Sequence, residues 1–440
     1  MIRAFLGIIG ALSLLFVPAI ARAADDSEGK AAATLEKLGA KLQLSGPEDK
    51  VVVVGVEFVN RRPTPDLWDS LKQLKGLKSL SLGGETITDK TLPEIVDLQQ
   101  LENLNLDTAA VTDAGLKFLY ALGNLHSLKL SFTRVTDRSW HELKGLHGLK
   151  RLDISCTDVT GKGIKELAEI NGLEELLLNG TQITDDAMKE LAKVKSIQML
   201  DLTDTALTGA GMAELKGLEH LHRLNLNTPR LETGVIKAIK ELKHLEYLDV
   251  SGSNLRDGPM SELSELTELK VLILSRTRIT GEGLKQIKGL KKLQKLDLWR
   301  TTMGDEDVAE LEDMESLEIL CLKDTDVEDL KAVGELKNLK SLDLSESHVT
   351  DEGLHQLKKL KHLERLELYQ TKVRDAGLKE LKDIKSLKYL GLHNTKVTDA
   401  GLSVLMQMTS LEELDIGSSD VTDAGVAEFK KANPNCKVIR

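Results

Sequence analysis

The side chains that most often perform chemistry are scattered along this chain. An enzyme needs acids, bases or metal ligands that converge in one pocket. The ten histidines, among them His141 and His147, have no cysteine or carboxylate partners at the spacing of a zinc site, and they fit solvated surface better. Glycine pairs such as Gly281 and Gly283 recur with the repeat described below, which indicates turns and not phosphate-binding loops. We therefore predict no catalytic residue, no cofactor and no metal.

The composition points to an aliphatic core that disulfides do not support. Aromatic residues make up 3% of the 440 residues, whereas apolar residues make up 41%, so leucine must fill the core. The three cysteines, Cys156, Cys321 and Cys436, are odd in number and far apart, which is not the pattern of a disulfide framework. Packing alone is expected to hold the fold together.

A leucine that recurs every 24 residues defines a repeated coil. Similar segments run from Leu104 to Leu116, from Leu366 to Leu378 and from Leu390 to Leu402. One step, between Leu320 and Leu342, is two positions shorter than the others. The fifteen anchor leucines stand at positions 80, 104, 128, 152, 176, 200, 224, 248, 272, 296, 320, 342, 366, 390 and 414. A fixed period of this length is typical of a solenoid.

Each coil has the pattern of a strand, a turn, a short helix and a return. The anchor Leu128 and Leu130 are both apolar, and this spacing of two predicts a short strand with one buried face. Apolar residues then recur at every third position, as in Leu116, Leu119 and Leu122, which suits a short helix or 3₁₀ segment. Eleven of the fifteen coils carry an aspartate after the turn, usually as Thr-Asp, which we interpret as a helix cap.

A column of hydroxyl side chains lies at the fifth position after the anchors. Such side chains can bind the backbone of the adjacent coil where the chain leaves the sheet. Twelve of the fifteen coils have one: Thr133, Thr157, Thr181, Thr205, Ser253, Thr277, Thr301, Thr325, Ser347, Thr371, Thr395 and Ser419.

The repeat LxxLxLxxTxVTDxGLxxLxxL resembles the leucine-rich repeat, in the 24-residue bacterial variety related to GALA-type repeats, with threonine in place of the usual asparagine. The resemblance covers about nine-tenths of the chain after residue 23. It implies an α/β fold: a right-handed, ribonuclease-inhibitor-like solenoid with a concave parallel β-sheet and short convex helices. It also implies an exported bacterial protein that binds other macromolecules, and it identifies no particular ligand.

Residues 1–23 have the pattern of a secretory signal peptide. Arg3 precedes an apolar stretch, and Ala21-Arg22-Ala23 forms an A-x-A cleavage site, so we expect cleavage after Ala23 and a secreted or periplasmic protein. An uncleaved membrane anchor is the alternative, but the stretch is short for a span of about 20 residues and Pro18 interrupts it.

The remaining chain divides into a solenoid with capped ends. Residues 24–51 are expected to form a capping helix and a turn, since Leu35, Leu38 and Leu42 share one helical face. The solenoid is expected over residues 52–432, beginning with an irregular zeroth coil at 52–79. A capping strand around Val438 is expected within residues 433–440. The irregular coils at 224–260 and 320–342 are candidate bends or binding bulges, although simple sequence drift explains them better.

The concave face should carry the functional surface, because strand alternation points side chains out of the sheet there. A column of aspartates, including Asp153, Asp201 and Asp249, is a candidate for cationic groups or weak calcium binding, and structural repetition explains it about as well. Large side chains and charges gather in coils nine to eleven and recur further along, with the composition of a binding hot spot. The predicted partner-binding residues are Val271, Ile273, Arg276, Lys295, Asp297, Trp299, Arg300, Ile319, Cys321, Lys323, Tyr369, Tyr389 and His393.

These observations favour a non-enzymatic interaction module with a protein or envelope-polysaccharide partner. The net charge of −11, which falls to −13 once the two arginines of the signal segment are removed, repels nucleic acid. The alternatives are a structural spacer of the cell envelope and an uncharacterised enzyme. The solenoid and its caps account for the chain from about residue 31 onward, so we expect no added catalytic domain and no membrane span after cleavage.

Overall fold

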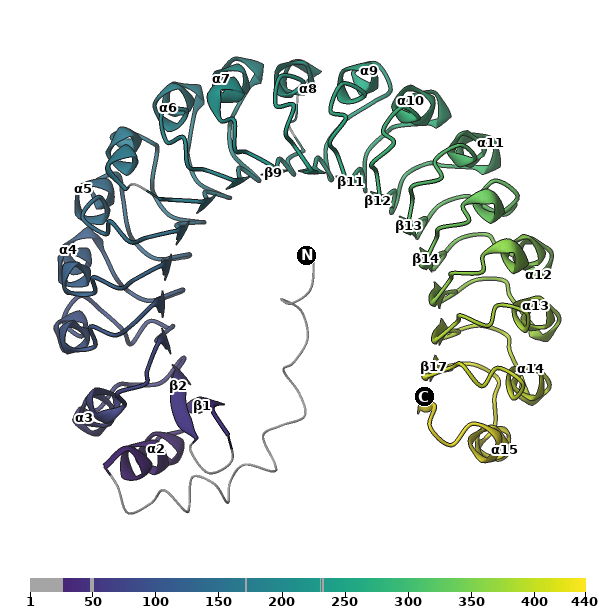
Figure 1. Ribbon diagram of the computed structural model, residues 1–440, viewed down its shortest axis with the longest axis horizontal. Helices are drawn as coiled ribbons and strands as arrows, with labels where there is room; N and C mark the ends of the chain where they lie inside the picture. Colours follow the sequence, from purple (N-terminus) through teal and green to yellow (C-terminus); the bar gives the residue numbers. More distant parts are fainter. Residues whose placement is uncertain (1–26, 48–50, 171, 230, 232) are drawn as a thin grey trace. The chain divides into compact units, whose positions relative to one another are not determined.

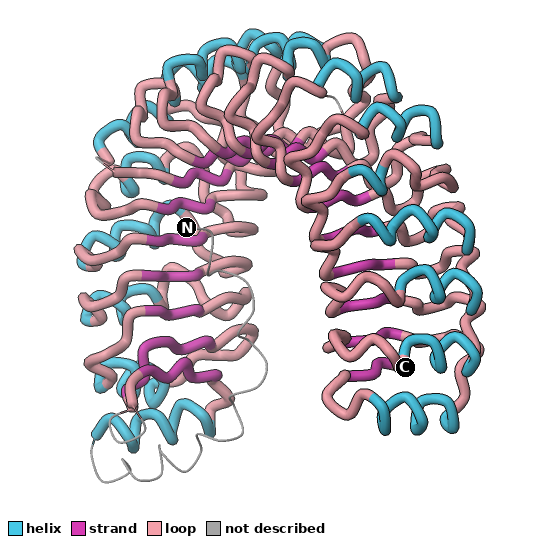
Figure 2. The backbone as a smooth tube through the Cα atoms, turned by 45° about the vertical axis from the view of Figure 1, so that its right-hand side comes forward, coloured by secondary structure: helices cyan, strands magenta, loops and turns pink. Residues whose placement is uncertain are grey.

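A computed structural model describes residues 27–47, 51–170, 172–229, 231 and 233–440. The predicted signal peptide lies outside the described residues. The structure divides into two compact units: the first extends to Asp201, and the second comprises Leu202–Arg440. In each unit, the strands line the concave side and the helices lie on the convex side (Figures 1 and 2).

The first unit begins with a helix and an antiparallel hairpin, after which strands and short helices alternate. Its strands from β2 to β8 pair in parallel with the next strand along the chain. The elements are α2 (Ser27–Lys37), β1 (Lys41–Ser45), β2 (Val52–Glu57), α3 (Pro65–Gln73), β3 (Ser79–Ser81), η1 (Leu92–Asp97), β4 (Asn103–Asn105), α4 (Asp113–Leu116), η2 (Lys117–Ala121), β5 (Ser127–Lys129), α5 (Ser139–Leu143), β6 (Arg151–Asp153), η3 (Ile164–Glu169), β7 (Glu175–Leu177), α6 (Asp185–Leu191) and β8 (Met199–Asp201).

The second unit repeats the same alternation, and its strands from β9 to β18 are also parallel. The elements are α7 (Gly209–Glu214), η4 (Leu215–Gly217), β9 (Arg223–Asn225), α8 (Thr233–Ile239), β10 (Tyr247–Asp249), α9 (Met260–Leu263), β11 (Val271–Ile273), α10 (Gly281–Ile287), β12 (Lys295–Asp297), α11 (Asp305–Val308), η5 (Ala309–Leu311), β13 (Ile319–Cys321), η6 (Val333–Glu335), β14 (Ser341–Asp343), α12 (Asp351–Leu354), η7 (His355–Lys359), β15 (Arg365–Glu367), α13 (Asp375–Leu381), β16 (Tyr389–Gly391), α14 (Asp399–Leu405), β17 (Glu413–Asp415), α15 (Asp423–Ala432) and β18 (Lys437–Ile439).

The period of the anchor leucines sets the register of the strands in both units. Within each unit, an anchor leucine lies opposite the next one, as Leu248 lies opposite Leu272, and every anchor is at most 1% exposed. The shortened coil keeps this register, because Leu320 pairs with Leu342. The expected last strand around Val438 is confirmed as β18, in which Val438 lies opposite Leu414. The irregular stretch near Pro229 is described only in part, since Arg230 lies outside the described residues.

The N-terminal end differs from two expectations. Val56, and not Val52, lies opposite Leu80, so the zeroth coil has the same length as the regular coils and is not irregular in this respect. The expected helical face that would include Leu42 is wrong, because α2 ends at Lys37 and Leu42 belongs to β1. Strand β1 pairs antiparallel with β2 and places Leu42 opposite Val56. The hairpin thereby satisfies the edge of β2 that a preceding coil would otherwise occupy.

The hydroxyl column bonds within its own coil and not to the adjacent coil. Thr277 Oγ1 donates to the carbonyl oxygen of Leu274 at 2.6 Å, and Thr301 Oγ1 donates to that of Leu298 at 2.7 Å. All twelve hydroxyls make the equivalent bond, to the carbonyl three positions back along the chain. A small hydroxyl therefore satisfies a carbonyl at the point where each strand turns toward the convex side.

The two positions of the Thr-Asp pattern divide two tasks between their side chains. A coil that has only one of the two residues, as at Thr280 or Asp257, keeps the task of that residue. The threonine caps its own helix, as Thr280 Oγ1 accepts from the backbone N–H of Glu282. The aspartate links its coil to the next: Asp257 Oδ1 accepts from the N–H of Thr280 at 2.7 Å, and Asp257 Oδ2 accepts from its hydroxyl at 2.8 Å. The prediction that these aspartates are helix caps therefore needs correction, because they form a ladder between coils.

A glycine three positions after the capping threonine makes room for this ladder. A Cβ on Gly283 would lie 2.6 Å from Asp257 Oδ1, and a Cβ on Gly425 would lie even closer to Asp399 Oδ1. Neither glycine has a positive φ, so its role here is space and not backbone freedom. The Thr-Asp-x-Gly pattern thus encodes contacts between successive coils as well as a turn.

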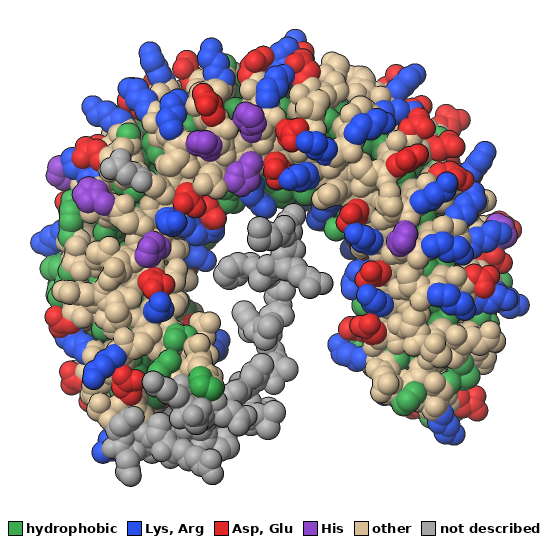
Figure 3. All heavy atoms as spheres, in the orientation of Figure 1, with side chains coloured by type: hydrophobic (Ala, Val, Ile, Leu, Met, Phe, Trp, Pro, Cys, Tyr) green, Lys and Arg blue, Asp and Glu red, His purple; other side chains and the backbone are tan. Residues whose placement is uncertain are grey.

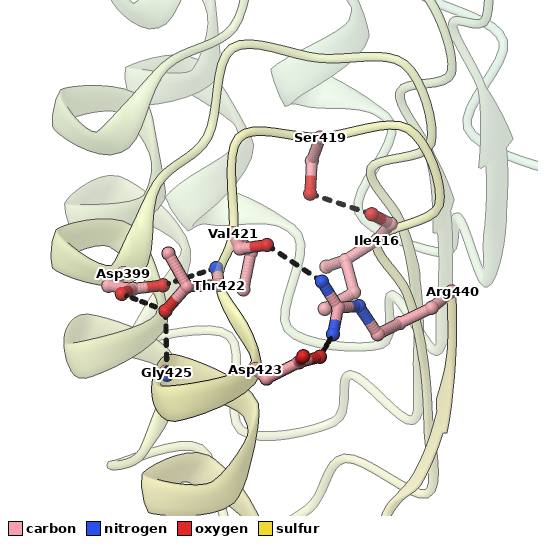
Figure 4. Close-up of polar contacts among 8 residues, drawn as sticks. All are labelled: Asp399, Ile416, Ser419, Val421, Thr422, Asp423, Gly425 and Arg440. Carbon is pink, nitrogen blue, oxygen red and sulfur yellow. Dashed lines mark hydrogen bonds and ion pairs between the residues drawn. The ribbon is translucent and has the colours of Figure 1, made fainter.

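Arg440 completes the ladder in the last coil (Figure 4). Asp399 binds Thr422 as in the preceding coils, whereas Asp423 is bound by the Arg440 guanidinium. Arg440 Nη2 also donates to the carbonyl oxygen of Val421 at 3.0 Å. The carbonyl of Val397, one coil earlier, accepts the N–H of Asp420 instead. Arg440 therefore binds the Asp423 carboxylate and the Val421 carbonyl. In earlier coils, the corresponding acceptors are bound by residues of the following coil.

Candidate functional site

The predicted partner-binding residues all lie in the second unit, on strands β11 to β16 and the residues that follow them. The register places Lys295 between Val271 and Ile319, and it places Asp297 between Ile273 and Cys321. The sequence suggested that charges frame a continuous apolar cluster. The structure instead puts one charged pair, on β12, in the middle of the cluster.

The apolar members differ in exposure. The side chain of Ile319 is 40% exposed, which is unusual for a large aliphatic residue in this chain, whereas Ile273 is only 8% exposed. Val271, Trp299 and Cys321 are partly buried. Ile319 is therefore the most exposed apolar member of the cluster, and Ile273 belongs to the core.

Two of the predicted cations, Arg276 and Lys295, have no carboxylate partner among the described residues. The Arg276 guanidinium lies 5.9 Å from the centre of the Trp299 ring, within reach of a cation–π interaction. Arg276 follows the end of β11 and has a left-handed backbone, with φ of 57°. Within the described part of the chain, the side chains of Arg276 and Lys295 have no ion pair and no hydrogen bond. Figure 3 shows other basic side chains along the same concave edge of the second unit.

The other two predicted cations are paired with carboxylates. Arg300 Nε lies 3.6 Å from Asp324 Oδ2, and Lys323 Nζ lies 3.1 Å from Glu346 Oε1. Lys323 Nζ also lies 5.7 Å from the centre of the Tyr369 ring. These two cations are therefore less available to a ligand than Arg276 and Lys295.

The acidic column has a structural use in the coils. Asp297 Oδ1 accepts from the backbone N–H of Trp299 at 3.0 Å and so closes a turn at the end of β12. The same contact, from an aspartate to the N–H two positions later, occurs at Asp153, Asp249, Asp343 and Asp415. Among the described residues, no group of three or more His, Cys, Asp or Glu side chains could hold a metal ion.

Burial changes the acidity of two groups in the cluster. Desolvation raises the pKa of the Asp297 carboxyl above its ordinary value, although the hydrogen bond from Trp299 opposes the shift. Desolvation also raises the pKa of the Cys321 thiol to about 12, and the nearby Asp297 charge adds to the effect. Cys321 is a free cysteine that stays protonated at neutral pH, so it is a poor nucleophile.

Tyr369 and His393 form a second group further along the face. Their ring centres lie 5.4 Å apart on adjacent coils, and His393 Nδ1 lies 3.7 Å from Asp415 Oδ1. Lys323 lies on the other side of Tyr369. The three predicted residues Lys323, Tyr369 and His393 are therefore in one connected row.

Tyr389 belongs to a separate cluster whose other members the sequence did not single out as binding residues. The Arg365 guanidinium lies 3.5 Å from the centre of the Tyr389 ring and pairs with Glu367. Burial raises the pKa of Tyr389 to about 12. Arg223 lies over the Tyr247 ring in the same way, at 3.7 Å. Both pairs have an arginine just before the anchor and a tyrosine at the equivalent position of the next coil, which is a signal that the repeat itself contains.

The lysine-rich returns are accounted for by ion pairs on the sides of the coils. Lys288 Nζ lies 2.7 Å from Glu310 Oε2, and Lys292 Nζ lies 2.6 Å from Glu268 Oε2. Lys270 and Glu246 form a similar pair at 2.8 Å. Such exposed pairs contribute little stability each, typically about 0.2–1 kcal/mol. No helix in the described residues has the length and apolar character that a membrane crossing requires.

Comparison with known proteins identifies the repeat and the fold. Residues 147–168, 335–357 and 407–430 match a family described as Leucine Rich repeat. No curated protein sequence matches the chain. A leucine-rich-repeat protein of Leptospira interrogans has 22% identity and a TM-score of 0.56, with 86% of this chain and 100% of that chain covered. The mouse RP105/MD-1 complex has 18% identity and a TM-score of 0.59, with 87% and 74% covered.

A Listeria monocytogenes internalin has 18% identity and a TM-score of 0.48, with 97% of this chain and 98% of that chain covered. At these identities, the Leptospira and mouse structures show a common fold and nothing about ligands. The chain therefore contains leucine-rich repeats in the three matched segments and shares the solenoid fold of the Leptospira and mouse structures.

Proposed function

We propose that the chain is an exported protein that binds a protein partner through the concave face of its second unit and catalyses no reaction. Two observations on adjacent strands carry the proposal: the exposed Ile319 on β13, next to Lys295, and the contact of Arg276 with Trp299 at the end of β12. Aromatic, arginine and exposed aliphatic side chains on one face are typical of the centre of a protein interface. A purely structural spacer would not need an isoleucine that is 40% exposed next to a lysine.

Three further observations support this proposal. The RP105/MD-1 structure is a complex of two proteins, built on a similar fold. Cys321 is protonated at neutral pH, and the acidic column is engaged with backbone N–H groups, so neither offers a ready catalytic group. The sequence of residues 1–23 predicts export, and N-terminal sequencing of the processed protein would test cleavage after Ala23.

The partner-binding surface is proposed to include two zones. The central zone consists of Val271, Arg276, Lys295, Trp299 and Ile319, with Arg300 and Lys323 at its rim. Tyr369, His393 and Tyr389 form a second zone that an extended partner would also contact. Ile273 supports the central zone from the core, since it is only 8% exposed, whereas Asp297 and Cys321 are partly buried and lie next to each other on β12 and β13. An envelope polysaccharide is the alternative ligand, since exposed aromatic rings also stack on sugars.

The test is a pull-down from the native envelope and medium with wild-type protein, Trp299→Ala and Lys129→Ala. Lys129 lies on β5, in the first unit, and serves as a control for the concave face elsewhere. We expect Trp299→Ala to weaken capture of the partner by about 2 kcal/mol or more while the protein stays folded. Retention of every partner by Trp299→Ala, together with their loss from Lys129→Ala, would move the site to the first unit. Specific capture of glycans instead of protein would favour the alternative.

A further inference from the structure

Around Lys295, the carboxylates of the aspartate column accept hydrogen bonds from the backbone, whereas two cations of the described residues have no ion pair, although the chain as a whole is acidic. Asp249, Asp297 and Asp343 are engaged with the backbone N–H groups of Ser251, Trp299 and Ser345. Their carboxylates therefore have less capacity to bind a cationic ligand than the aspartate column suggests. A charged partner must find its complement in side chains that are not already engaged.

Arg276 and Lys295 are such side chains. They lie on adjacent coils but at different positions along the strands, since Lys295 pairs with Val271, five positions before Arg276. Among the described residues, the Arg276 guanidinium has no ion pair and no hydrogen bond, and a cation over a ring keeps its N–H groups free for an anion. Lys295 lies at the centre of the surface, between Val271 and Ile319. Asp297, on the same strand, interacts electrostatically with Lys295, and burial raises the pKa of the Asp297 carboxyl.

The neighbours of Lys295 define what must accompany the anion. Adjacent strands lie about 4.8 Å apart, so Val271 and Ile319 lie about 10 Å apart with Lys295 midway. A carboxylate placed over Lys295 would have an apolar contact on each side. On an α-helix, residues i, i+4 and i+7 rise about 6 and 10.5 Å along the axis, which is close to this spacing.

We infer that the surface around Lys295 and Arg276 binds an acidic segment of a partner protein, in which a carboxylate lies between two apolar side chains. The inference rests on the proposed function, because it names the chemistry of the partner at the same surface. It differs from the expectation drawn from the aspartate column, which was a cationic partner or calcium.

The experiment measures binding of two fluorescently labelled peptide probes to the intact protein by anisotropy. Both are alanine-based helical peptides of about 15 residues or more. One carries leucine, glutamate and leucine at positions i, i+4 and i+7, and the other carries lysine in place of the glutamate. Each probe is titrated with wild-type protein, with Arg276→Gln/Lys295→Gln and with Arg278→Gln/Lys291→Gln.

Arg278 and Lys291 make the second double variant a matched control. Both are exposed cations of the same coil region, they lie outside the strands, and their loss changes the net charge by the same amount. We expect the glutamate probe to bind wild-type protein at least about tenfold more tightly than the lysine probe. We expect Arg276→Gln/Lys295→Gln to remove this preference and the control to retain it, since charge-assisted contacts have strengths of this order.

Equal binding of the two probes, tighter binding of the lysine probe or binding of neither would overturn the inference. An equal loss in both double variants would do so too, because it would reduce the effect to net charge. The proposed function is tested by a different result: it is refuted if substitutions on the concave face, such as Trp299→Ala, leave capture of the partner unchanged in the pull-down. A partner whose capture depends on Trp299 but not on Arg276 and Lys295 would leave the proposed function standing and refute this inference.

Discussion

The ladder between coils predicts that a glycine-to-alanine change in a helix should destabilise the protein. Helix propensity alone predicts that Gly283→Ala, in α10, stabilises by up to about 1 kcal/mol. The new Cβ, however, would lie 2.6 Å from Asp257 Oδ1. Asp257 would have to move and would lose its bonds to the N–H and hydroxyl of Thr280, at 2.7 and 2.8 Å.

The magnitude follows from these two bonds. Each bond to a charged acceptor contributes about 1.5 kcal/mol at the lower end of its usual range, which suits a half-buried group. Subtracting the gain in helix propensity leaves a net destabilisation of about 2 kcal/mol for Gly283→Ala. In an Asp257→Ala background the nearest remaining atom is Met260 Cγ, at 3.2 Å, on a flexible side chain. There the same glycine substitution should be neutral or stabilising.

The assay is urea unfolding of wild type, both single variants and the double variant, followed by circular dichroism. The change of sign between the two backgrounds is the diagnostic result, because a double-mutant cycle isolates the coupling between the two positions. A Gly283→Ala protein that is more stable than wild type would refute the reasoning. So would an equal loss in both backgrounds, which would assign the cost to Met260 or to the helix itself.

Three other outcomes follow from the structure. Leu200→Ala should cost about 2–5 kcal/mol, far more than Asp201→Ala, because Leu200 is fully buried; equal melting temperatures would show that the strand register is wrong. Hydrogen bonds from Thr422 hold the pKa of Asp399 below its ordinary value of 3.8. The ionised Asp399 therefore stabilises the folded protein above pH 3.8, and this stabilisation is lost as the pH falls through the lower pKa of the folded state. Urea midpoints of Asp399→Ala and wild type should therefore differ at neutral pH and converge in acid; a difference independent of pH would contradict this. Calorimetric titration with calcium should give no heat and no melting shift, because the aspartate column is engaged with backbone N–H groups; clear binding would show that these carboxylates are available.

Much of the fold could be predicted from the sequence because the anchors carry one simple physical requirement. An aliphatic side chain that recurs once in every coil must be buried, and Leu248, Leu272 and the others are. The first coil was harder to place, since four consecutive valines at 51–54 are equally apolar and offer no unique anchor. The pairing of β1 with β2 and the register of Val56 with Leu80 decide it, and both are long-range contacts.

The polar columns show what a one-dimensional pattern leaves open. The sequence indicates that Asp257 stands near the start of a helix, but not that its carboxylate binds Thr280 in the next coil. The same holds for the candidate site: the sequence gives the positions of its residues but not their contacts. Its residues were selected by position in the repeat, yet the contact of the Arg276 guanidinium with the Trp299 ring joins two coils and is not visible in the spacing. The arginine and tyrosine pairs were detectable, because their spacing equals one coil.

Site-specific photocrosslinking in the native producing cells tests the central proposal most directly. A benzophenone amino acid is placed at Ile319, on the concave face, and separately at Glu312, an exposed residue at the end of η5 on the convex side. The account predicts a discrete crosslinked protein band from position 319 that is absent from position 312 and that weakens in the Trp299→Ala background. Crosslinks from position 312 with none from position 319 would contradict binding through the concave face.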